Sequence, residues 1–404
     1  MASRLPGINQ TVSGAVHCTP KAACKVLRHT SCALAFGLVP FRNFRYLLIV
    51  LPLSLLKRIK GREYSRRQDM GNTDIWKYCT GEQCRDMLLD FRLLGDVNWS
   101  REKQLACLYS LSNHAEEHYH LKKITGKSGR QRTLQIPDAF LKKVQKNLLR
   151  NVLDDLPVSS YATAYGRGKS ILSNAVPHTG KEKILKLDMR DFFGNITFFQ
   201  VRQNVFGGLL FPGSVGTLLT HLCCYRDYLP QGAPTSGAVS NLVLKSFDES
   251  LGNWCSIRKI TYTRYCDDMT FSGSFDSREV KNKVESYLRV LGFELNTRKT
   301  KVLESGTRQM VTGIVVNEKP QADRDYRRRL RQECHYCLKY GPDPVRVSSN
   351  KPKEAYLTGL LGKVNYVLQI NPEDMYFKEI KRQLTQLQRE AGEFPDAAKR
   401  PPQE

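Results

Sequence analysis

Two adjacent carboxylates interrupt a segment whose other residues predict a buried β-hairpin. Asp267 and Asp268 follow Tyr265 and Cys266 inside the mostly apolar stretch 260–271. An unpaired charge in a protein interior costs several kcal/mol, so the two acids need a compensating positive charge. Carboxylate oxygens are the ligands that hard divalent cations prefer. We therefore expect strands over 259–264 and 269–272, with the acid pair at the turn between them.

A third carboxylate with the same character ends another short apolar strand. Residues 183–189 read Lys-Ile-Leu-Lys-Leu-Asp-Met, which places Asp188 at the end of the strand. Separate strands that bring three acids to one point are how a two-metal phosphoryl-transfer site is built. An Asp-Asp pair by itself is more often a turn or a solvated loop, because short motifs match by chance. Asp191 is out of register with the strand and is expected to be a cap or a salt-bridge partner.

The charge of the chain points to a polyanionic partner. Its 404 residues include 63 Lys and Arg against 39 Asp and Glu, a net charge of +24. A solvated basic face is the ordinary alternative, but an excess this large is typical of nucleic-acid binding first and of anionic membranes second. The basic residues run through the whole chain, which favours nucleic acid. The apolar run 46–56 is shorter than the about 20 residues of a spanning helix, so no membrane partner is expected.

The cysteines indicate a reducing compartment. Twelve of them are spread irregularly, and no convincing secretory signal precedes them, so reduced thiols in the cytoplasm are expected. Cys334 and Cys337 form a single Cys-x-x-Cys, which does not hold zinc without a second pair. Together with Tyr326 and Leu330 they fall at helical spacing, which predicts packing in a core.

The pattern along the chain predicts an α+β protein with a central sheet region. Residues 1–69 carry twelve Lys and Arg and two acids. Three interpretations stay open for them: a poorly ordered basic arm, which we favour, an interfacial helix, or a translated segment upstream of a true start near Met70. An N-terminal α/β part (70–183), an α+β centre (184–318) with inserted helices (about 200–235), a C-terminal helical part (319–393) and a disordered tail (394–404) are predicted to follow. This order suits a hand-like polymerase, in which these parts would be the fingers, the palm with inserted fingers helices, and the thumb.

Hydrophobic periodicity predicts the individual elements. Helices are expected over 76–94, 102–119, 139–153, 200–205, 215–224, 236–251, 278–290, 322–340, 353–368 and 372–390. Besides the strands already named, strand character appears over 128–136, 301–303 and 310–316.

Five ordered motifs make the chain similar to the bacterial retron reverse transcriptases. They are Leu187–Phe193, Leu229–Ser236 and Tyr265–Asp268, with Asn174–His178 before the first of these and Val311–Gly313 after the last. The resemblance runs from about residue 120 to about residue 390 and implies an RNA-directed DNA polymerase. It also implies a right-hand architecture of fingers, an antiparallel palm sheet and a helical thumb.

The resemblance implies roles for the acids and for one lysine. Asp188 and Asp267 would bind two Mg²⁺ ions, with Asp268 close by and the Met189 carbonyl as a further oxygen ligand. One metal lowers the pKa of the attacking hydroxyl, and the other stabilises the pyrophosphate leaving group. Lys299 matches the lysine near that pyrophosphate and would act as a general acid, whereas an isolated lysine is ordinarily a solvated surface charge.

Contacts to the deoxynucleoside triphosphate (dNTP) substrate follow from the same resemblance. Arg132 would bind the triphosphate through its planar guanidinium, with Arg130 as a rival in the same strand. Phe193 matches the steric gate that excludes a 2′-hydroxyl, although a phenylalanine there is also a core candidate. Gln231 and Gly232 lie in a turn, where the glycine would let the backbone approach the template–nucleotide pair and the glutamine would hydrogen-bond to it.

Contacts to RNA are expected in two places. Asn174 and His178, spaced i and i+4, are usually a structural pair, but the resemblance implies a role in handling structured RNA. A basic stripe on the helix 322–340 suits the backbone of an A-form duplex, with a solvated helix face as the alternative. The stripe consists of Arg324, Arg327, Arg328 and Arg331.

The reaction that the resemblance implies is Mg²⁺-dependent, RNA-templated DNA synthesis. The template is a structured non-coding RNA, and priming from the 2′-hydroxyl of an internal guanosine gives a branched RNA–DNA hybrid, msDNA. A separate effector protein in anti-phage defence is expected. A host RNase H is expected to remove the template, because about 85 residues after Pro320 leave no room for such a domain beside the thumb. Alternatives are a group II intron or diversity-generating reverse transcriptase and, from another class, a catalytically inactive polymerase-like RNA-binding scaffold.

Overall fold

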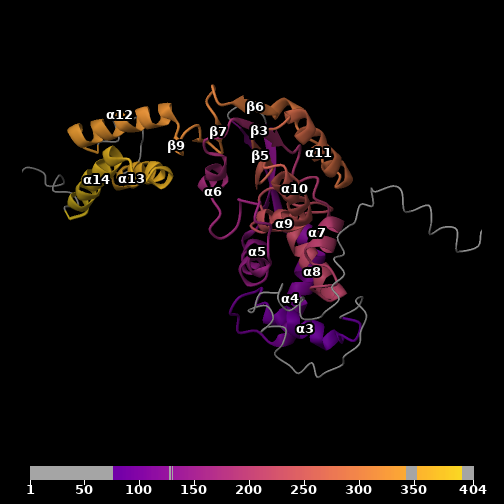
Figure 1. Cartoon of the computed structure of the whole chain (residues 1–404). Helices are drawn as coiled ribbons and strands as arrows, with labels where there is room; N and C mark the ends of the chain where they lie inside the picture. Colours follow the sequence, from indigo (N-terminus) through magenta and orange to yellow (C-terminus); the bar gives the residue numbers. More distant parts are fainter. Residues whose placement is uncertain (1–75, 127–128, 130, 343–352, 394–404) are drawn as a thin grey trace, which may run out of the picture. The chain divides into compact units, whose positions relative to one another are not determined.

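The structure is a computed structural model that describes residues 76–126, 129, 131–342 and 353–393 (Figure 1). Every described residue belongs to one compact unit, 49–404. The predicted basic arm 1–69, the predicted tail 394–404 and Arg130 lie outside the described residues.

The first described part consists of helices and one hairpin. Helix α3 (Gly81–Asp90) begins with a capping box between Thr80 and Gln83, and α4 (Arg101–Asn113) is capped by Ser100. The antiparallel strands β1 (Tyr119–Thr125) and β2 (Gln131–Pro137) follow, and then α5 (Ala139–Asn151), whose N-cap is Asp138. Two short 3-10 helices, η2 (Ala115–His118) and η3 (Leu153–Asp155), flank this region.

The predicted helix 102–119 is too long, and strand β1 was missed. Helix α4 ends at Asn113, and the chain passes through η2 into β1. Only Tyr119 of β1 is buried, while the other six residues are exposed. A strand without a buried face has no apolar alternation to detect, which explains the miss.

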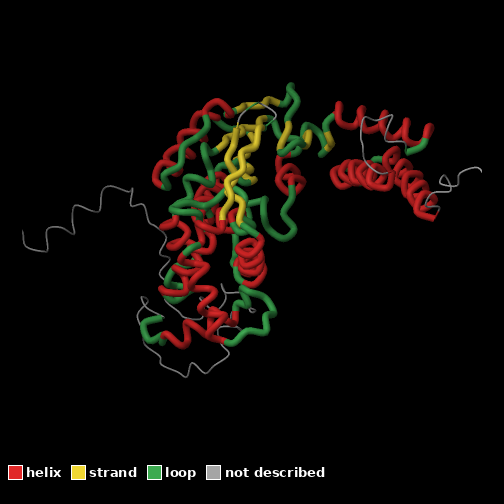
Figure 2. Tube along the Cα trace, turned by 180° about the vertical axis from the view of Figure 1, so that it is seen from behind, coloured by secondary structure: helices red, strands yellow, loops and turns green. Residues whose placement is uncertain are grey.

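A four-stranded antiparallel sheet occupies the centre of the unit (Figure 2). Its order is β4 (Thr261–Tyr265), β5 (Asp268–Gly273), β3 (Lys183–Asp188) and β6 (Lys301–Glu304). The expected strands before Asp188 and on both sides of the acid pair are confirmed. The sheet therefore brings together strands that lie about 80 residues apart in sequence.

Helices pack with this sheet around one large apolar core. They are α3, α4 and α5 together with α7 (Phe198–Asn204), α8 (Gly213–Cys223), α9 (Ser236–Val243), α10 (Lys245–Ile257) and α11 (Ser277–Val290). The short α6 (Ile171–Ala175) packs instead in a second core, and the 3-10 helices η4 (Val176–His178) and η5 (Thr297–Lys299) precede β3 and β6. The single helix predicted over 236–251 is wrong. The chain leaves helical geometry at Leu244, where ψ is 6°, so the predicted helix is divided into α9 and α10. Helix α10 packs against β4.

The C-terminal part has a second core. Strand character over 310–316 resolves into two short strands, β7 (Met310–Val311) and β8 (Ile314–Val315), because Thr312 and Gly313 have φ of +45° and +84° and reverse the chain. Strand β9 (Gln321–Ala322) completes a three-stranded sheet. Helices α12 (Arg324–Tyr340), α13 (Lys353–Ile370) and α14 (Met375–Glu393) follow, as expected.

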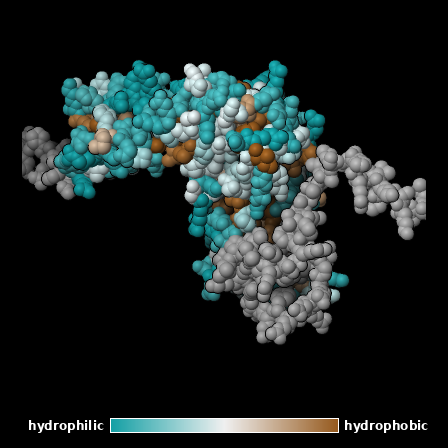
Figure 3. Space-filling model, viewed as in Figure 1, coloured by the Kyte–Doolittle hydropathy of each residue, from teal (hydrophilic) through white to brown (hydrophobic). Residues whose placement is uncertain are grey.

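Cys334 and Cys337 are buried in this second core together with Leu330, which confirms the prediction of core packing. No helix among the described residues is long and apolar enough to span a membrane. On the face drawn in Figure 3, hydrophilic residues cover most of the described surface, and apolar residues appear in small separate groups.

Candidate active site

The sheet register brings the predicted acids to one place. Strands β3 and β5 pair antiparallel with Asp188 directly opposite Asp268. The Met189 amide donates a hydrogen bond of 3.1 Å to the Asp267 carbonyl oxygen, so the strand end and the hairpin turn are joined. Directly opposed residues in a sheet project their side chains to the same face. Two strands and one turn thus gather three carboxylates at one end of the sheet.

Asp188 is nearly buried and is held by two donors. Only 4% of the residue is exposed. The Lys299 ammonium donates to Oδ2 at 2.7 Å, and Asn296 Nδ2 donates to Oδ1 at 3.1 Å. Lys299 stands on η5, whose preceding residue Asn296 also bonds the Asp188 carbonyl through its amide at 2.7 Å. The structure thus places Lys299 in direct contact with Asp188, whereas its expected role beside the pyrophosphate stays a prediction.

The electrostatics of the site favour a cation. Burial, then the neighbouring charge of Asp267 and that of Asp188, raise the pKa of Asp268 to about 6, while Lys186 and Lys299 oppose the rise. A carboxyl whose pKa rises beside other acids is one that an added positive charge would stabilise. Within the described ranges, no three acidic, His or Cys side chains are arranged as a ready metal site. In this arrangement the Lys299 ammonium is the positive charge that contacts Asp188.

The turn that carries Asp267 has a strained backbone. Tyr265 and Asp268 are paired, so Cys266 and Asp267 form a two-residue hairpin loop, and Cys266 has φ of +61°. Such loops commonly place glycine at a position of positive φ. A non-glycine residue held there indicates that the surroundings impose the conformation.

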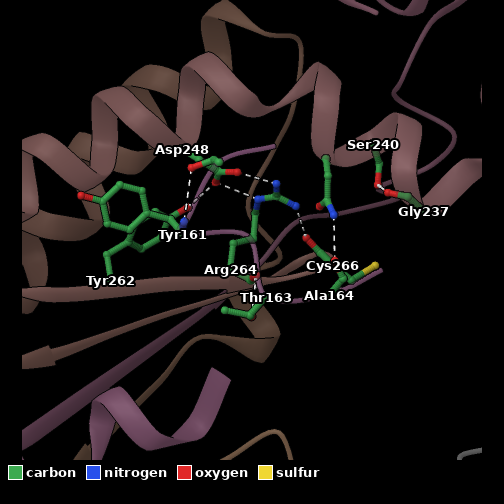
Figure 4. Close-up of polar contacts among 11 residues, drawn as sticks. Tyr161, Thr163, Ala164, Gly237, Ser240, Asp248, Tyr262, Arg264 and Cys266 are labelled. Carbon is green, nitrogen blue, oxygen red and sulfur yellow. Dashed lines mark hydrogen bonds and ion pairs between the residues drawn. The ribbon is translucent and has the colours of Figure 1, made fainter. Parts of the chain in front are cut away.

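A buried ion pair supports this turn from behind (Figure 4). Arg264 donates from Nη1 to the Cys266 carbonyl at 3.0 Å and from Nε to Asp248 Oδ1 at 2.8 Å. Its Nη2 lies 2.5 Å from Asp248 Oδ2, and both side chains are completely buried. Asp248 Oδ1 also accepts from the Tyr262 hydroxyl at 2.8 Å. Sequence reasoning missed this pair, although an arginine in a strand predicted to be buried was a signal that a buried acid would be near.

The turn with Gln231 and Gly232 is joined to strand β2. Gln135 of β2 donates its amide to the Gln231 carbonyl at 3.1 Å, and its side-chain oxygen accepts from the Gln231 amide at 2.8 Å. Gly232 has φ of +140°, and a Cβ there would lie 2.7 Å from the Gln135 carbonyl oxygen. The close approach that the structure gives for Gly232 is thus to β2, whereas the predicted approach was to a template–nucleotide pair.

The other residues expected to contact the nucleotide have separate positions. Phe193 is half-buried and meets Phe192 edge to face, with ring centroids 5.1 Å apart. Arg132 is exposed on β2, opposite Ile124 of β1. Asp191 is exposed in the turn after β3 with φ of +44°, off the strand as expected.

The prediction that Asn174 and His178 contact RNA requires correction, because both side chains are completely buried. Asn174 Oδ1 accepts from the hydroxyls of Thr163 and Thr263, each at 2.8 Å. The two ring nitrogens of His178 lie 2.7 Å from the Ser272 hydroxyl and 2.8 Å from the Thr263 hydroxyl. These residues therefore join α6 and η4 to the back of strands β4 and β5.

The two retron signatures meet in the same network. Asn174 Nδ2 donates to the Thr312 hydroxyl at 3.4 Å, and that hydroxyl donates to the Ile171 carbonyl at 2.9 Å. The Asn174–His178 and Val311–Gly313 motifs are thus joined by a direct hydrogen bond between Asn174 and Thr312. On α12, Arg324, Arg328 and Arg331 are exposed, whereas Arg327 is half-buried.

Comparison with known proteins decides the family. The model of the family "Reverse transcriptase (RNA-dependent DNA polymerase)" matches residues 121–336. The retron Ec86 reverse transcriptase of Escherichia coli is 35% identical over 214 residues, 52% of this chain and 67% of that protein. The retron Mx65 reverse transcriptase of Myxococcus xanthus is 32% identical over 323 residues, 72% of this chain and 73% of that protein. The chain belongs to the retron reverse transcriptases.

This retron reverse transcriptase is therefore an RNA-directed DNA polymerase with an α+β architecture. Its family generally uses divalent metal ions and dNTPs. Among solved structures, a telomerase from Candida albicans in complex with a fragment of telomeric RNA aligns with a TM-score of 0.37 and 10% identity, over 71% of this chain and 68% of that one. That score is too low to support an argument about the retron enzyme.

Proposed function

We propose that this retron reverse transcriptase extends DNA at a two-metal site formed by Asp188, Asp267, Asp268 and the Met189 carbonyl. The observation that carries the proposal is the register of β3 and β5, which opposes Asp188 to Asp268 beside the Asp267 turn. The donor set fits Mg²⁺, since it consists of hard oxygen atoms. It also fits electrostatically, because burial and then the neighbouring acids raise the pKa of Asp268 to about 6, so an added positive charge would stabilise its ionised form.

When bound, two Mg²⁺ ions would lower the pKa of the attacking hydroxyl and stabilise charge on the pyrophosphate. The protein's own groups divide the remaining work. The end of β3 and the turn that carries Asp267 would hold the carboxylate and carbonyl ligands in place. Lys299, now 2.7 Å from Asp188 Oδ2, would release that carboxylate and turn its ammonium toward the leaving pyrophosphate as a general acid.

Contacts to the dNTP substrate are proposed for four further residues. Phe193 would exclude the 2′-hydroxyl of a ribonucleotide. Gln231, whose backbone is fixed to β2, would hydrogen-bond the incoming dNTP, and Gly232 allows that turn to sit against β2. Arg132 on the same strand would bind the triphosphate.

The template is proposed to be a structured non-coding RNA, and its cDNA product to remain in contact with the enzyme. The net charge of +24 supports a nucleic-acid partner. The exposed Arg324, Arg328 and Arg331 of α12 would contact duplex phosphates. In keeping with the retron family, we propose priming from an internal 2′-hydroxyl to give msDNA, a separate effector protein in anti-phage defence, removal of template by host RNase H, and a cytoplasmic location.

Primer extension with purified protein tests the proposal. The reaction contains the RNA encoded just upstream of the gene, dNTPs and Mg²⁺. Asp188→Asn and Asp267→Asn are expected to abolish cDNA synthesis while the variants still bind the RNA. Asp191→Asn, an exposed acid three residues past Asp188, is the matched control and should remain active.

Three outcomes would redirect the assignment. Full activity of Asp267→Asn would remove that carboxylate from the metal site. Wild-type protein that binds the RNA but makes no cDNA under any divalent metal would favour the inactive scaffold. Products that begin on a separate primer, without a branched linkage, would favour a group II intron or diversity-generating type.

A further inference from the structure

Tyr165 contacts the turn formed by Cys266 and Asp267 through a side-chain hydrogen bond. Its hydroxyl donates to the Cys266 sulfur at 3.0 Å. Arg264 holds the carbonyl of the same cysteine at 3.0 Å. Cys266 is therefore held at both its backbone and its side chain, and it is the residue whose positive φ defines the turn before Asp267.

The ring of Tyr165 packs directly against a glycine of helix α9. A Cβ on Gly237 of α9 would lie 2.4 to 2.9 Å from three atoms of the ring, closer than real Cβ contacts allow. Gly237 therefore lets the ring lie directly on the helix. Tyr165 itself has φ of +58°, a strained value for a tyrosine, so its placement is imposed by its surroundings.

The loop that carries Tyr165 is fixed to strand β4 and to α9. The Thr163 amide donates to the Arg264 carbonyl at 2.8 Å, and the Arg264 amide donates to the Tyr161 carbonyl at 2.8 Å. Asn241 of α9 donates to the Ala164 carbonyl at 2.8 Å. The hydrogen bonds of the loop and the packing of the ring on Gly237 thus place the Tyr165 hydroxyl against the Cys266 sulfur.

We propose that Tyr165 is a positioning residue for DNA synthesis, acting through Cys266 to hold the turn that carries Asp267 beside the end of β3, where Asp188 lies. The residue is 51% exposed, so it is not a side chain of the apolar core. A small displacement of a catalytic group slows the chemical step far more than it weakens substrate binding. The inference rests on the proposed role of Asp267.

The test measures single-nucleotide incorporation on an RNA template under single-turnover conditions. Tyr165→Phe keeps the ring and removes the donor. Its maximal rate should fall about tenfold, the worth of one ordinary hydrogen bond, with the apparent Kd for dNTP changed by less than about twofold. Gly237→Ala displaces the ring and should cost more. Tyr161→Phe is the matched control, because Tyr161 lies in the same loop and its ring likewise packs against a helix glycine, Gly252.

A double-mutant cycle shows whether Tyr165 acts through Cys266. In a Cys266→Ala background, Tyr165→Phe should cost nothing further, since the bond is already absent. Additive losses, or a Tyr165→Phe enzyme as fast as wild type, would overturn the inference. So would equal losses in Tyr161→Phe. Asp267→Asn is measured in the same assay. An active Asp267→Asn enzyme would contradict the proposed function itself. An inactive Asp267→Asn enzyme together with an unimpaired Tyr165→Phe enzyme would reject only the role of Tyr165.

Discussion

The Lys299 ammonium and the Asp188 carboxylate form an ion pair at 2.7 Å in which the lysine is about half exposed and the acid is nearly buried. The same lysine that would protonate the pyrophosphate thus neutralises a proposed metal ligand. On the proposed mechanism a cation bound at Oδ2 would have to displace this ammonium, whose side chain is partly exposed to solvent.

Lys299→Met is expected to separate these two roles. Loss of the general acid should lower the maximal rate by about 100-fold. Loss of the competing ammonium should lower the Mg²⁺ concentration needed for half-maximal activity. Steady-state primer extension across a Mg²⁺ series measures both. Lys301→Met, an exposed lysine two residues along, is the control and should change neither quantity; a wild-type rate in Lys299→Met would remove the general acid from the mechanism.

The sequence predicted the sheet and the acids because their signals are local. Strand β3 and the hairpin of β4 and β5 are short segments with buried apolar residues, and acids interrupt them at Asp188 and at the Asp267–Asp268 pair. The supports of the site could not be predicted in the same way. Arg264 meets Asp248 from another element, and Tyr165 reaches Cys266 across 101 residues. Partner choice over such separations depends on tertiary packing, which no periodicity reports.

For Asn174 and His178, the sequence predicted a contact with RNA where the structure has a buried structural role. Their motif belongs to the resemblance to the retron enzymes, but in the structure both side chains form hydrogen bonds to residues of β4 and β5. A polar pair recognised by resemblance was read as a binding site, although a helix turn before a buried strand is a position where polar side chains often satisfy neighbouring hydroxyls.

Replacing Phe193 tests the steric gate. Phe193→Ala should lower the preference for dNTPs over ribonucleotides by about 10- to 100-fold, because the half-buried ring would no longer exclude a 2′-hydroxyl. The ratio of kcat/KM for dGTP and GTP measures this preference. Phe199→Ala, which removes a ring that is 69% exposed on α7, should leave the ratio unchanged. An unchanged ratio in Phe193→Ala would assign that ring to the core alone.

Gly232→Ala should loosen the contact between the Gln231 turn and β2. The new Cβ would lie 2.7 Å from the Gln135 carbonyl oxygen, at a φ of +140° that L-residues rarely adopt. We expect the free energy of unfolding to fall by about 1–3 kcal/mol and the KM for dNTP to rise. Urea denaturation and primer extension measure these effects. Gly306→Ala is the control, because a Cβ there meets no atom within 4 Å.

Removing one partner of the buried ion pair should destabilise the enzyme strongly. Asp248→Ala leaves the Arg264 guanidinium charged and buried, which is expected to cost about 3–5 kcal/mol of unfolding free energy. Glu249→Ala removes the adjacent, exposed acid and should cost little. Chemical denaturation followed by circular dichroism compares the two. Equal, small losses would show that the pair does not stabilise the fold.

The buried imidazole of His178 predicts how stability depends on pH. Burial, with a smaller effect of Lys181, lowers the pKa of His178 from 6.5 to about 3. Between these values the unfolded chain binds a proton that the folded protein does not, so the contribution is complete above pH 6.5 and decreases as the pH falls. At pH 5 the loss relative to pH 7.5 should be about 2 kcal/mol.

Urea denaturation of wild type and His178→Gln at both pH values measures this loss. The variant should be less stable at pH 7.5, because its hydrogen bonds to Ser272 and Thr263 are disturbed, yet its stability should change less between pH 7.5 and pH 5. His335→Gln replaces an exposed histidine on α12 and should retain the full wild-type pH dependence. If His178→Gln and wild type lost the same free energy on acidification, the decrease would have to come from other groups, and His178 would not be the neutral, buried imidazole that joins η4 to the sheet.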